Sequence, residues 1–236
     1  MNSPTYETLR EECCAANRDL AAAGLIDLTF GNISVLANDA SVFAIKPSGV
    51  PYEALTPPDI VVLNLEGDVV WGDKRPSSDT PTHRRLLAAF SSSGIRAIAH
   101  THSRAATAFA QAGISLPDLG TTHADYFRGP VPVTRSLTPE EVSGEYEWET
   151  GKMILETVDL QSPAEIPAVL VRNHGPFVWA SSGKKAVEVA AALEIVADLA
   201  LKTMAINPIA APLPRYLAEK HFLRKHGSTA YYGQPG

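Results

Sequence analysis

The sequence lacks the features that mark several classes of protein. Its only cysteines, Cys13 and Cys14, are adjacent on a predicted helix, which fits neither a disulfide framework nor a cysteine zinc site. The amino terminus, Met1 to Arg10, is polar and has no apolar signal-peptide region, and no stretch is long and apolar enough to span a bilayer. We therefore expect a cytoplasmic protein with no membrane partner.

Positive charge is scarce as well. The chain has 20 lysines and arginines against 26 aspartates and glutamates, for a formal net charge of -6 at pH 7. Because nucleic acids are held by clustered lysine and arginine side chains, this balance argues against a nucleic-acid partner. A small anionic ligand requires local groups that outweigh the overall negative field.

Apolar residues, in contrast, are sufficient for a folded core. Hydrophobic residues make up 45% of the 236 positions and charged residues 19%, a composition typical of a globular chain rather than a disordered one. The sequence contains no repeat, linker or low-complexity segment. We therefore expect residues 1–236 to form a single domain.

The order of the predicted elements favours an α/β fold. Capping residues and apolar periodicity predict helices over 4–23 and 81–90, from 103, from 138, and along a long stripe around 193–204. Alternation and turn residues predict strands at 33–36, 42–45, 60–65, 68–71, 95–99 and 168–171, a short one near 131, and a loop over 117–126. Such an irregular mixture indicates a mainly antiparallel sheet covered by helices.

The strongest local signal for chemistry is His100-Thr101-His102, directly after an apolar strand. Side chains two positions apart on an extended segment point to the same side, so both imidazoles can reach one ion. A catalytic zinc site commonly takes three protein ligands, and His174, just past another buried strand, is the best third donor. Asp79 can add an oxygen. Single histidines are more often ordinary polar residues in turns, so the spacing alone leaves the metal site open.

Three segments have the composition of an anion-binding site. In Gly31-Asn32-Ile33-Ser34 and Lys46-Pro47-Ser48-Gly49, glycine allows backbone N–H groups to approach an anion, and the lysine adds charge. In Pro76-Ser77-Ser78-Asp79, two hydroxyls lie at a predicted helix start, where the helix dipole favours a bound anion. Each segment taken singly is equally typical of ordinary turns.

Taken together, these motifs resemble those of the class II aldolase/adducin family. Four segments in one order carry the resemblance: Lys46-Pro-Ser-Gly49, Pro76-Ser-Ser-Asp-Thr-Pro-Thr-His83, His100-Thr-His-Ser103 and Asn173-His-Gly-Pro176. Further segments are similar to the L-ribulose-5-phosphate 4-epimerases of that family: Gly120-Thr-Thr-His-Ala-Asp-Tyr126, Gly144-Glu-Tyr-Glu-Trp-Glu-Thr150, and Lys220 to Gly227 with Tyr231-Tyr232-Gly233.

The resemblance implies a three-layer α/β/α fold and a set of functional residues. Zinc would be held by His100, His102 and His174, with Asp79 contacting or orienting the metal site. Asp125 and Tyr232 would be the two proton-transfer groups. The substrate, mainly its phosphate, would be bound by Gly31, Asn32, Lys46, Ser48, Gly49, Ser77 and Ser78.

The resemblance also implies an assembly and a reaction. The assembly would be a cyclic homotetramer with active sites between subunits, to which His221 and Tyr232 come from a neighbour. The reaction would interconvert L-ribulose 5-phosphate and D-xylulose 5-phosphate, a step used in both arabinose and ascorbate breakdown. Related aldolases usually have glutamate at the position of Asp79, so the aspartate favours the epimerase. Imidazole sites accept several divalent ions, so zinc is not the only metal that fits.

Three other functions fit part of the sequence. A class II aldolase of the fuculose- or rhamnulose-phosphate type would use the same metal and phosphate groups but release its fragments. A Schiff-base aldolase would use Lys46 as nucleophile. A non-catalytic binding module like the adducin head would share the fold alone. Of the remaining histidines, His83 and His226 are predicted at a helix surface or interface, and His123 as support rather than as a ligand.

Overall fold

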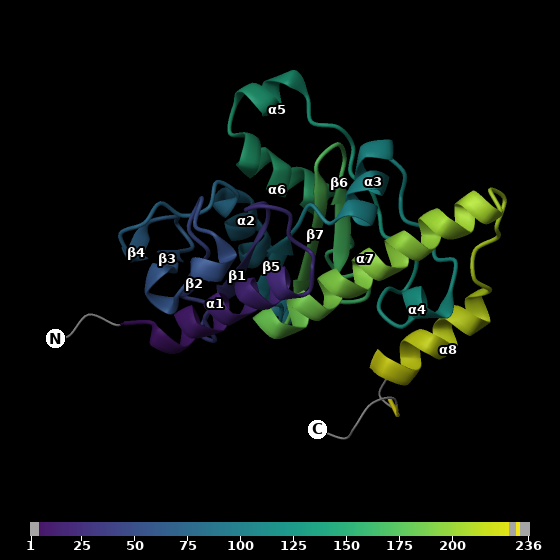
Figure 1. Ribbon diagram of the computed structural model, residues 1–236, viewed down its shortest axis with the longest axis horizontal. Helices are drawn as coiled ribbons and strands as arrows, with labels where there is room; N and C mark the ends of the chain where they lie inside the picture. Colours follow the sequence, from purple (N-terminus) through teal and green to yellow (C-terminus); the bar gives the residue numbers. More distant parts are fainter. Residues whose placement is uncertain (1–4, 227–229, 232–236) are drawn as a thin grey trace.

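The computed structural model describes residues 5–226 and 230–231. In this part of the chain, strands form one sheet in the order β4-β3-β2-β1-β5-β7-β6, and all neighbouring strands are antiparallel (Figure 1). The predicted antiparallel sheet is therefore confirmed. The strands are β1 (Asn32–Leu36), β2 (Val42–Ile45), β3 (Val61–Asn64), β4 (Val69–Trp71), β5 (Ala97–His100), β6 (Ala168–Val171) and β7 (Gly175–Ala180).

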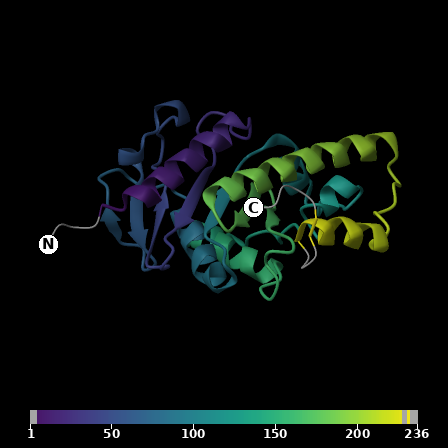
Figure 2. The same cartoon turned by 90° about the horizontal axis from the view of Figure 1, so that it is seen from below.

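Helices cover both faces of the sheet, as the three-layer prediction requires. One face packs against α1 (Glu7–Ala22), α3 (Arg104–Ala112) and α7 (Gly183–Ile206), and α1 and α7 run side by side across it (Figure 2). The other face packs against α2 (Thr80–Phe90) and α6 (Tyr146–Thr157). The remaining helices are α4 (Thr121–Ala124), α5 (Pro139–Ser143), α8 (Arg215–His226), η1 (Tyr52–Ala54), η2 (Pro57–Asp59) and η3 (Ser91–Ser93).

The pleat of β5 determines which layer receives its histidine. Ala97 and Ala99 pack in the core beneath α1, α3 and α7, whereas Ile98 packs in the core beneath α2 and α6. Because side chains alternate along a strand, His100 lies on the same face as Ile98. The imidazole therefore points into the layer that holds α2 and α6.

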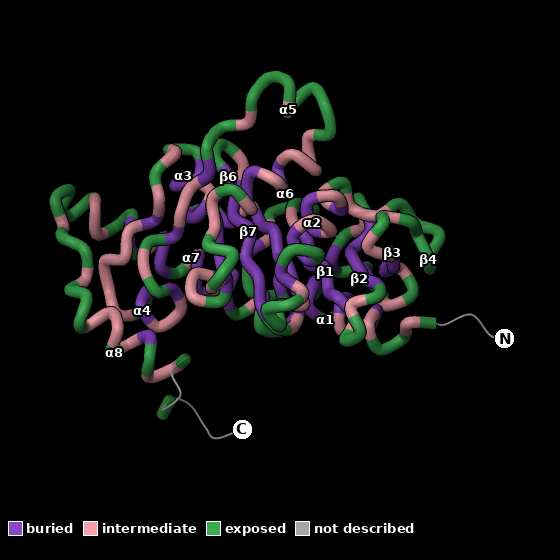
Figure 3. Tube along the Cα trace, turned by 180° about the vertical axis from the view of Figure 1, so that it is seen from behind, coloured by how far each residue is buried: buried purple, intermediate pink, exposed green. Residues whose placement is uncertain are grey.

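Burial falls off in the segments that lie away from the sheet. Figure 3 shows buried residues concentrated in the sheet and its flanking helices, whereas α5 and α8 are mostly half-buried or exposed. Helix α8 packs against α4, and Phe222 is its one buried residue. None of the helices in the described ranges is long and apolar enough to cross a membrane.

Four details of the predicted element order were wrong. The first helix begins at Glu7 rather than at Pro4, because Tyr6 has a left-handed backbone (φ 50°) that a continuous helix does not allow. The predicted loop over 117–126 contains the one-turn helix α4. The strand near Val131 is only an isolated bridge to Leu116. The elements β7, α6 and α8 were not predicted.

Candidate metal centre

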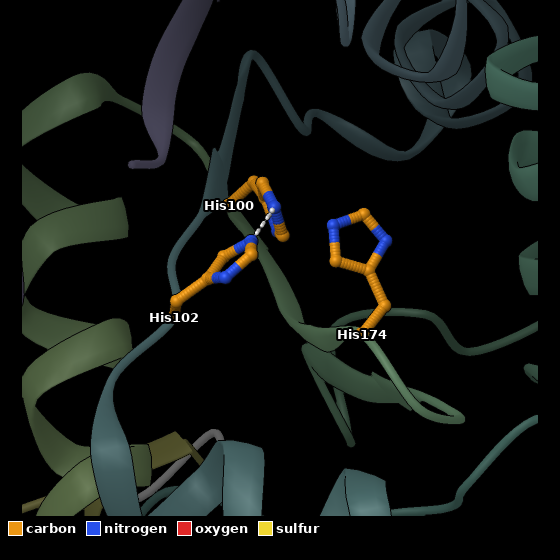
Figure 4. A group of neighbouring side chains, drawn as sticks. All are labelled: His100, His102 and His174. Atoms are coloured by element: carbon orange, nitrogen blue, oxygen red, sulfur yellow. Dashed lines mark hydrogen bonds between the residues drawn. The ribbon is translucent and has the colours of Figure 1, made fainter. Parts of the chain in front are cut away.

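Three histidines from two separate parts of the sequence converge at one end of the sheet. His100 is the last residue of β5, His102 follows it, and His174 lies in the turn between β6 and β7. One ligand atom from each residue lies within 4.8 Å of the other two (Figure 4). The sequence predicted these three side chains as a set, and the structure brings them together.

Two glycines allow the backbones around the histidines to approach this closely. A Cβ atom on Gly175 would lie 2.6 Å from the carbonyl oxygen of Thr101, and one on Gly31 would lie 2.5 Å from that of His100. Gly31 also has φ +83°, a left-handed conformation that L side chains rarely adopt. Any larger residue at either position would push the histidine-bearing strand away from its neighbour.

The imidazole of His100 is fixed in one orientation. Its Nδ1 lies 3.0 Å from the carbonyl oxygen of Pro176, and since a carbonyl only accepts, Nδ1 carries the proton and donates. The ring of Phe177 stacks on it at 4.2 Å between centroids. The lone pair is therefore on Nε2, which lies 3.1 Å from Nε2 of His102.

Burial keeps this cluster uncharged. Removal from water lowers the pKa of His100 to about 3, and burial also lowers the pKa of His102 and His174. Neutral imidazoles have lone pairs to offer a cation, and three of them converging on one point suit zinc or a related divalent transition metal. The donor set therefore fits the metal expected from the sequence.

Asp79 lies beside this cluster at the start of α2. Its Oδ2 accepts a hydrogen bond of 2.7 Å from the amide of Asn32, and it lines the same cavity as the histidines. Burial raises the pKa of this carboxyl, but nearby His100 and His83 and the Asn32 amide outweigh burial and lower it overall. Among the described residues, the group with metal-ligand spacing contains the three histidines and not Asp79.

A cavity of about 360 Å³ opens over the histidines. Its lining includes every residue predicted to bind substrate apart from His221, namely Gly31, Asn32, Lys46, Ser48, Gly49, Ser77 and Ser78. Two of their segments pair through backbone hydrogen bonds, with the N–H of Ser77 donating to Lys46 at 3.1 Å and that of Ser48 to Arg75 at 3.0 Å. Three distant stretches of sequence thus form one wall.

Lys46 gives this wall its positive charge. Its side chain is buried, which lowers its pKa, and its ammonium lies 4.6 Å from the ring centroid of Tyr52. The hydroxyl of Tyr52 in turn donates to the carbonyl of Gly31 at 2.5 Å and so holds the glycine turn in place. Lys46 therefore gives the cavity a cationic group for an anion, although the chain has a net negative charge and Asp79 adds a carboxylate to the same lining.

Comparison with known proteins agrees with this geometry. Residues 11–201 match the family described as Class II Aldolase and Adducin N-terminal domain. The chain belongs to the class II aldolase and adducin family. The family resemblance stated from the sequence motifs is thereby confirmed.

Members of this family are similar to the chain along most of its length. L-ribulose-5-phosphate 4-epimerase UlaF of Salmonella paratyphi C is 48% identical over 97% of this chain and 99% of its own. Among solved structures, an L-fuculose 1-phosphate aldolase is 25% identical with a TM-score of 0.74, covering 91% of this chain and 94% of that one. An L-fuculose-1-phosphate aldolase of Thermus thermophilus is 28% identical with a TM-score of 0.65, covering 85% and 97%.

The two remaining predicted residues that the structure describes form a separate cluster. Asp125 follows α4, and its Oδ1 lies 3.1 Å from Nδ1 of His221 on α8. Arg224 binds both carboxylate oxygens, at 3.1 and 2.8 Å. Burial raises the pKa of Asp125, but the hydrogen bonds from Arg224 and His221 lower it overall. Neither Asp125 nor His221 lines the histidine cavity, and Tyr232 lies outside the described residues.

The environment of His83 differs from the prediction. Rather than lying at a surface, it is fully buried, and its Nδ1 lies 2.7 Å from the hydroxyl of Ser34. The sequence held the signal, since His83, Leu86, Leu87 and Phe90 recur at the spacing of a core-facing helical stripe. His226 is exposed, as predicted, and His123 is buried away from the metal-binding group, with Nε2 2.7 Å from the Gly129 carbonyl oxygen.

Proposed function

We propose that this protein is a zinc-dependent L-ribulose-5-phosphate 4-epimerase. The observation that carries the proposal is that three neutral imidazoles line the same cavity as a buried lysine and several serines. The 48% identity to a protein named as that epimerase, over 97% of the chain, supports the choice of substrate. Asp79, where related aldolases usually have glutamate, supports the epimerase over an aldolase.

Inverting the configuration at carbon 4 of the sugar requires a carbon–carbon bond to break. Carbon 4 of ribulose 5-phosphate is β to the carbonyl, so its hydrogen is not acidic enough for inversion by simple deprotonation. A retro-aldol step across C3–C4 instead gives the enediolate of dihydroxyacetone and glycolaldehyde phosphate. If the aldehyde rotates before the bond re-forms, attack on its opposite face gives D-xylulose 5-phosphate.

The cavity residues and the two proposed proton carriers have distinct parts in this reaction. A bound divalent ion supplies Lewis-acid stabilisation of the negative charge that develops on the sugar. Lys46 and the hydroxyls of Ser48, Ser77 and Ser78 bind the phosphate and keep both fragments in place. Asp125 and Tyr232 carry protons on the two faces of the aldehyde, since the C4 hydroxyl loses its proton on one side and regains it on the other.

These two proton carriers require a neighbouring subunit. Asp125 and His221 do not line the cavity of their own chain, so we propose a cyclic homotetramer in which they, with Tyr232, complete the cavity of the next subunit. Exposed apolar side chains on α7 support such an assembly: Ile195, Leu199 and Ile206 are 55%, 47% and 86% exposed. Apolar side chains on a helix face of this kind are typical of a subunit contact.

Product analysis tests the proposal. Purified protein is expected to convert L-ribulose 5-phosphate to D-xylulose 5-phosphate, to lose this activity in a chelator, and to regain it with zinc. Accumulation of free dihydroxyacetone and glycolaldehyde phosphate as main products would instead identify an aldolase. Chelator-resistant turnover together with borohydride trapping at Lys46 would identify a Schiff-base enzyme.

A further inference from the structure

Each of the three clustered histidines has a different contact that fixes the orientation of its ring. His100 donates to a backbone carbonyl, and the ring of His102 stacks on Phe30 at 5.4 Å between centroids. For His174, the partner is a side chain that donates and accepts: Nδ1 lies 3.4 Å from the hydroxyl of Tyr146. Histidines that bind metals almost always give their second ring N–H to such an acceptor.

His174 is fixed through its backbone, since its N–H donates to the carbonyl of Val171 at 3.0 Å, and the contact with Tyr146 acts on the orientation of its ring. It lies in the short turn between β6 and β7, next to Asn173, whose φ is +61°. Its ring meets His100 and His102 edge-on, at 4.8 and 5.0 Å between centroids. With Nδ1 toward Tyr146, the other nitrogen of His174 faces His100 and His102 (Figure 4).

Tyr146 is itself held firmly in place. It is the first residue of α6, and its carbonyl accepts from the hydroxyl of Thr150 at 2.8 Å. The next two carbonyls of the helix accept from side chains of α2, namely the hydroxyl of Thr82 and the guanidinium of Arg85. The start of α6 is thus fastened to α2, whose N-cap residue is Asp79.

We propose that Tyr146 is a positioning residue for His174, whose Nδ1–H it accepts so that the Nε2 lone pair faces the other two imidazoles. The inference rests on the proposed metal centre. A neutral phenol oxygen accepts this proton while adding no charge to the site.

Tyr146→Phe removes the acceptor and keeps the ring. Zinc affinity, measured by competition with a chromophoric chelator, is expected to fall about 10-fold or more, the usual effect of losing such a partner. The visible spectrum of the cobalt-substituted protein is expected to change, because the ligand field of His174 changes. The thermal midpoint of the metal-free protein should stay close to that of wild type. Tyr216→Phe, the same change at a tyrosine 80% exposed, serves as the control.

A double variant separates positioning from a general structural effect. In a His174→Ala background, Tyr146→Phe is expected to change zinc affinity less than about twofold, because the interaction is already absent. Equal losses in both backgrounds would overturn the inference, as would a Tyr146→Phe protein with wild-type affinity and cobalt spectrum. If wild-type protein binds no metal, the proposed function fails instead.

Discussion

The histidine cluster and the Asp125 cluster differ in how the chain builds them. The histidines stand at the end of β5 and in the turn between β6 and β7, and burial keeps them neutral. Asp125 lies between α4 and α8 in a less buried part of the molecule, and pairing with Arg224 and His221 keeps it charged. One cluster depends on the core of its own chain, and the other lies where a second chain can reach it.

This difference suggests that metal binding and proton transfer depend on different parts of the proposed enzyme. Binding a metal requires three donors held within a few ångströms, which a rigid sheet provides. Moving protons on two faces of a substrate requires groups that enter from outside the cavity. A neighbouring subunit can supply those groups without disturbing the core that holds the imidazoles.

The largest effect is expected from the histidine cluster. His102→Gln removes a half-buried donor with little loss of packing, so the protein should fold while losing its metal. Turnover is expected to fall roughly 10³-fold or more, the size of losing a preorganised stabiliser of developing charge. Elemental analysis and the epimerase assay measure both effects. Stoichiometric zinc and normal turnover in this variant would refute the ligand role of His102.

A substitution in the Asp125 cluster should lower turnover without changing the metal content. Asp125→Asn removes a proton carrier, and kcat is expected to fall about 10²-fold, the lower end of what general acid–base groups contribute. Zinc content should stay at the wild-type level, since Asp125 does not line the histidine cavity. Loss of zinc along with activity would mean that the two clusters are not independent.

Buried His83, near the histidine cluster, and Asp125 should give acid sensitivity in different pH windows. Burial lowers the pKa of His83, close to the metal site, to about 4, so the unfolded chain binds a proton between pH 6.5 and 4 that the folded chain does not. His83 alone therefore lowers stability by about 3 kcal/mol as the pH drops through this window, and in metal-free protein the lowered pKa of His100 adds to the decline. In metal-free protein, His83→Gln should remove its own part and make the decline in urea unfolding curves shallower. Asp125, with its lowered pKa, contributes stability that is lost only below its ordinary pKa of 3.8.

The smallest effect is expected from Arg224, which lowers the pKa of Asp125. Arg224→Gln raises that pKa, so the acidic limb of the kcat/KM profile should move toward neutral pH by about one unit. Full pH–rate profiles of the variant and wild type give the comparison. An unchanged acidic limb would show that Asp125 does not govern it.

The sequence predicted those parts of the site whose signal is local. His100 and His102 are two apart where a strand ends, and the glycine and serine segments lie next to strand or helix ends, so short patterns pointed to them, although the histidine spacing alone left the metal site open. The antiparallel sheet followed from the hairpins in the same way. Asp125, His221 and Tyr232 were named from resemblance alone.

Other features depend on contacts between distant residues and left no such pattern. The hydroxyl of Tyr146 meets His174 only after α6 has packed against α2. His221 reaches Asp125 across 96 positions of sequence. Helix α8 has no apolar stripe, so its place beside α4 is decided by packing and ion pairs rather than periodicity.

The most direct test of the account is to mix two inactive proteins. His102→Gln and Asp125→Asn subunits are unfolded together, refolded at equal concentrations and assayed for epimerase activity. If each site takes its histidines from one subunit and Asp125 from the next, random mixing should restore about one quarter of wild-type activity. Activity no higher than that of the two parent variants would contradict a site shared between subunits.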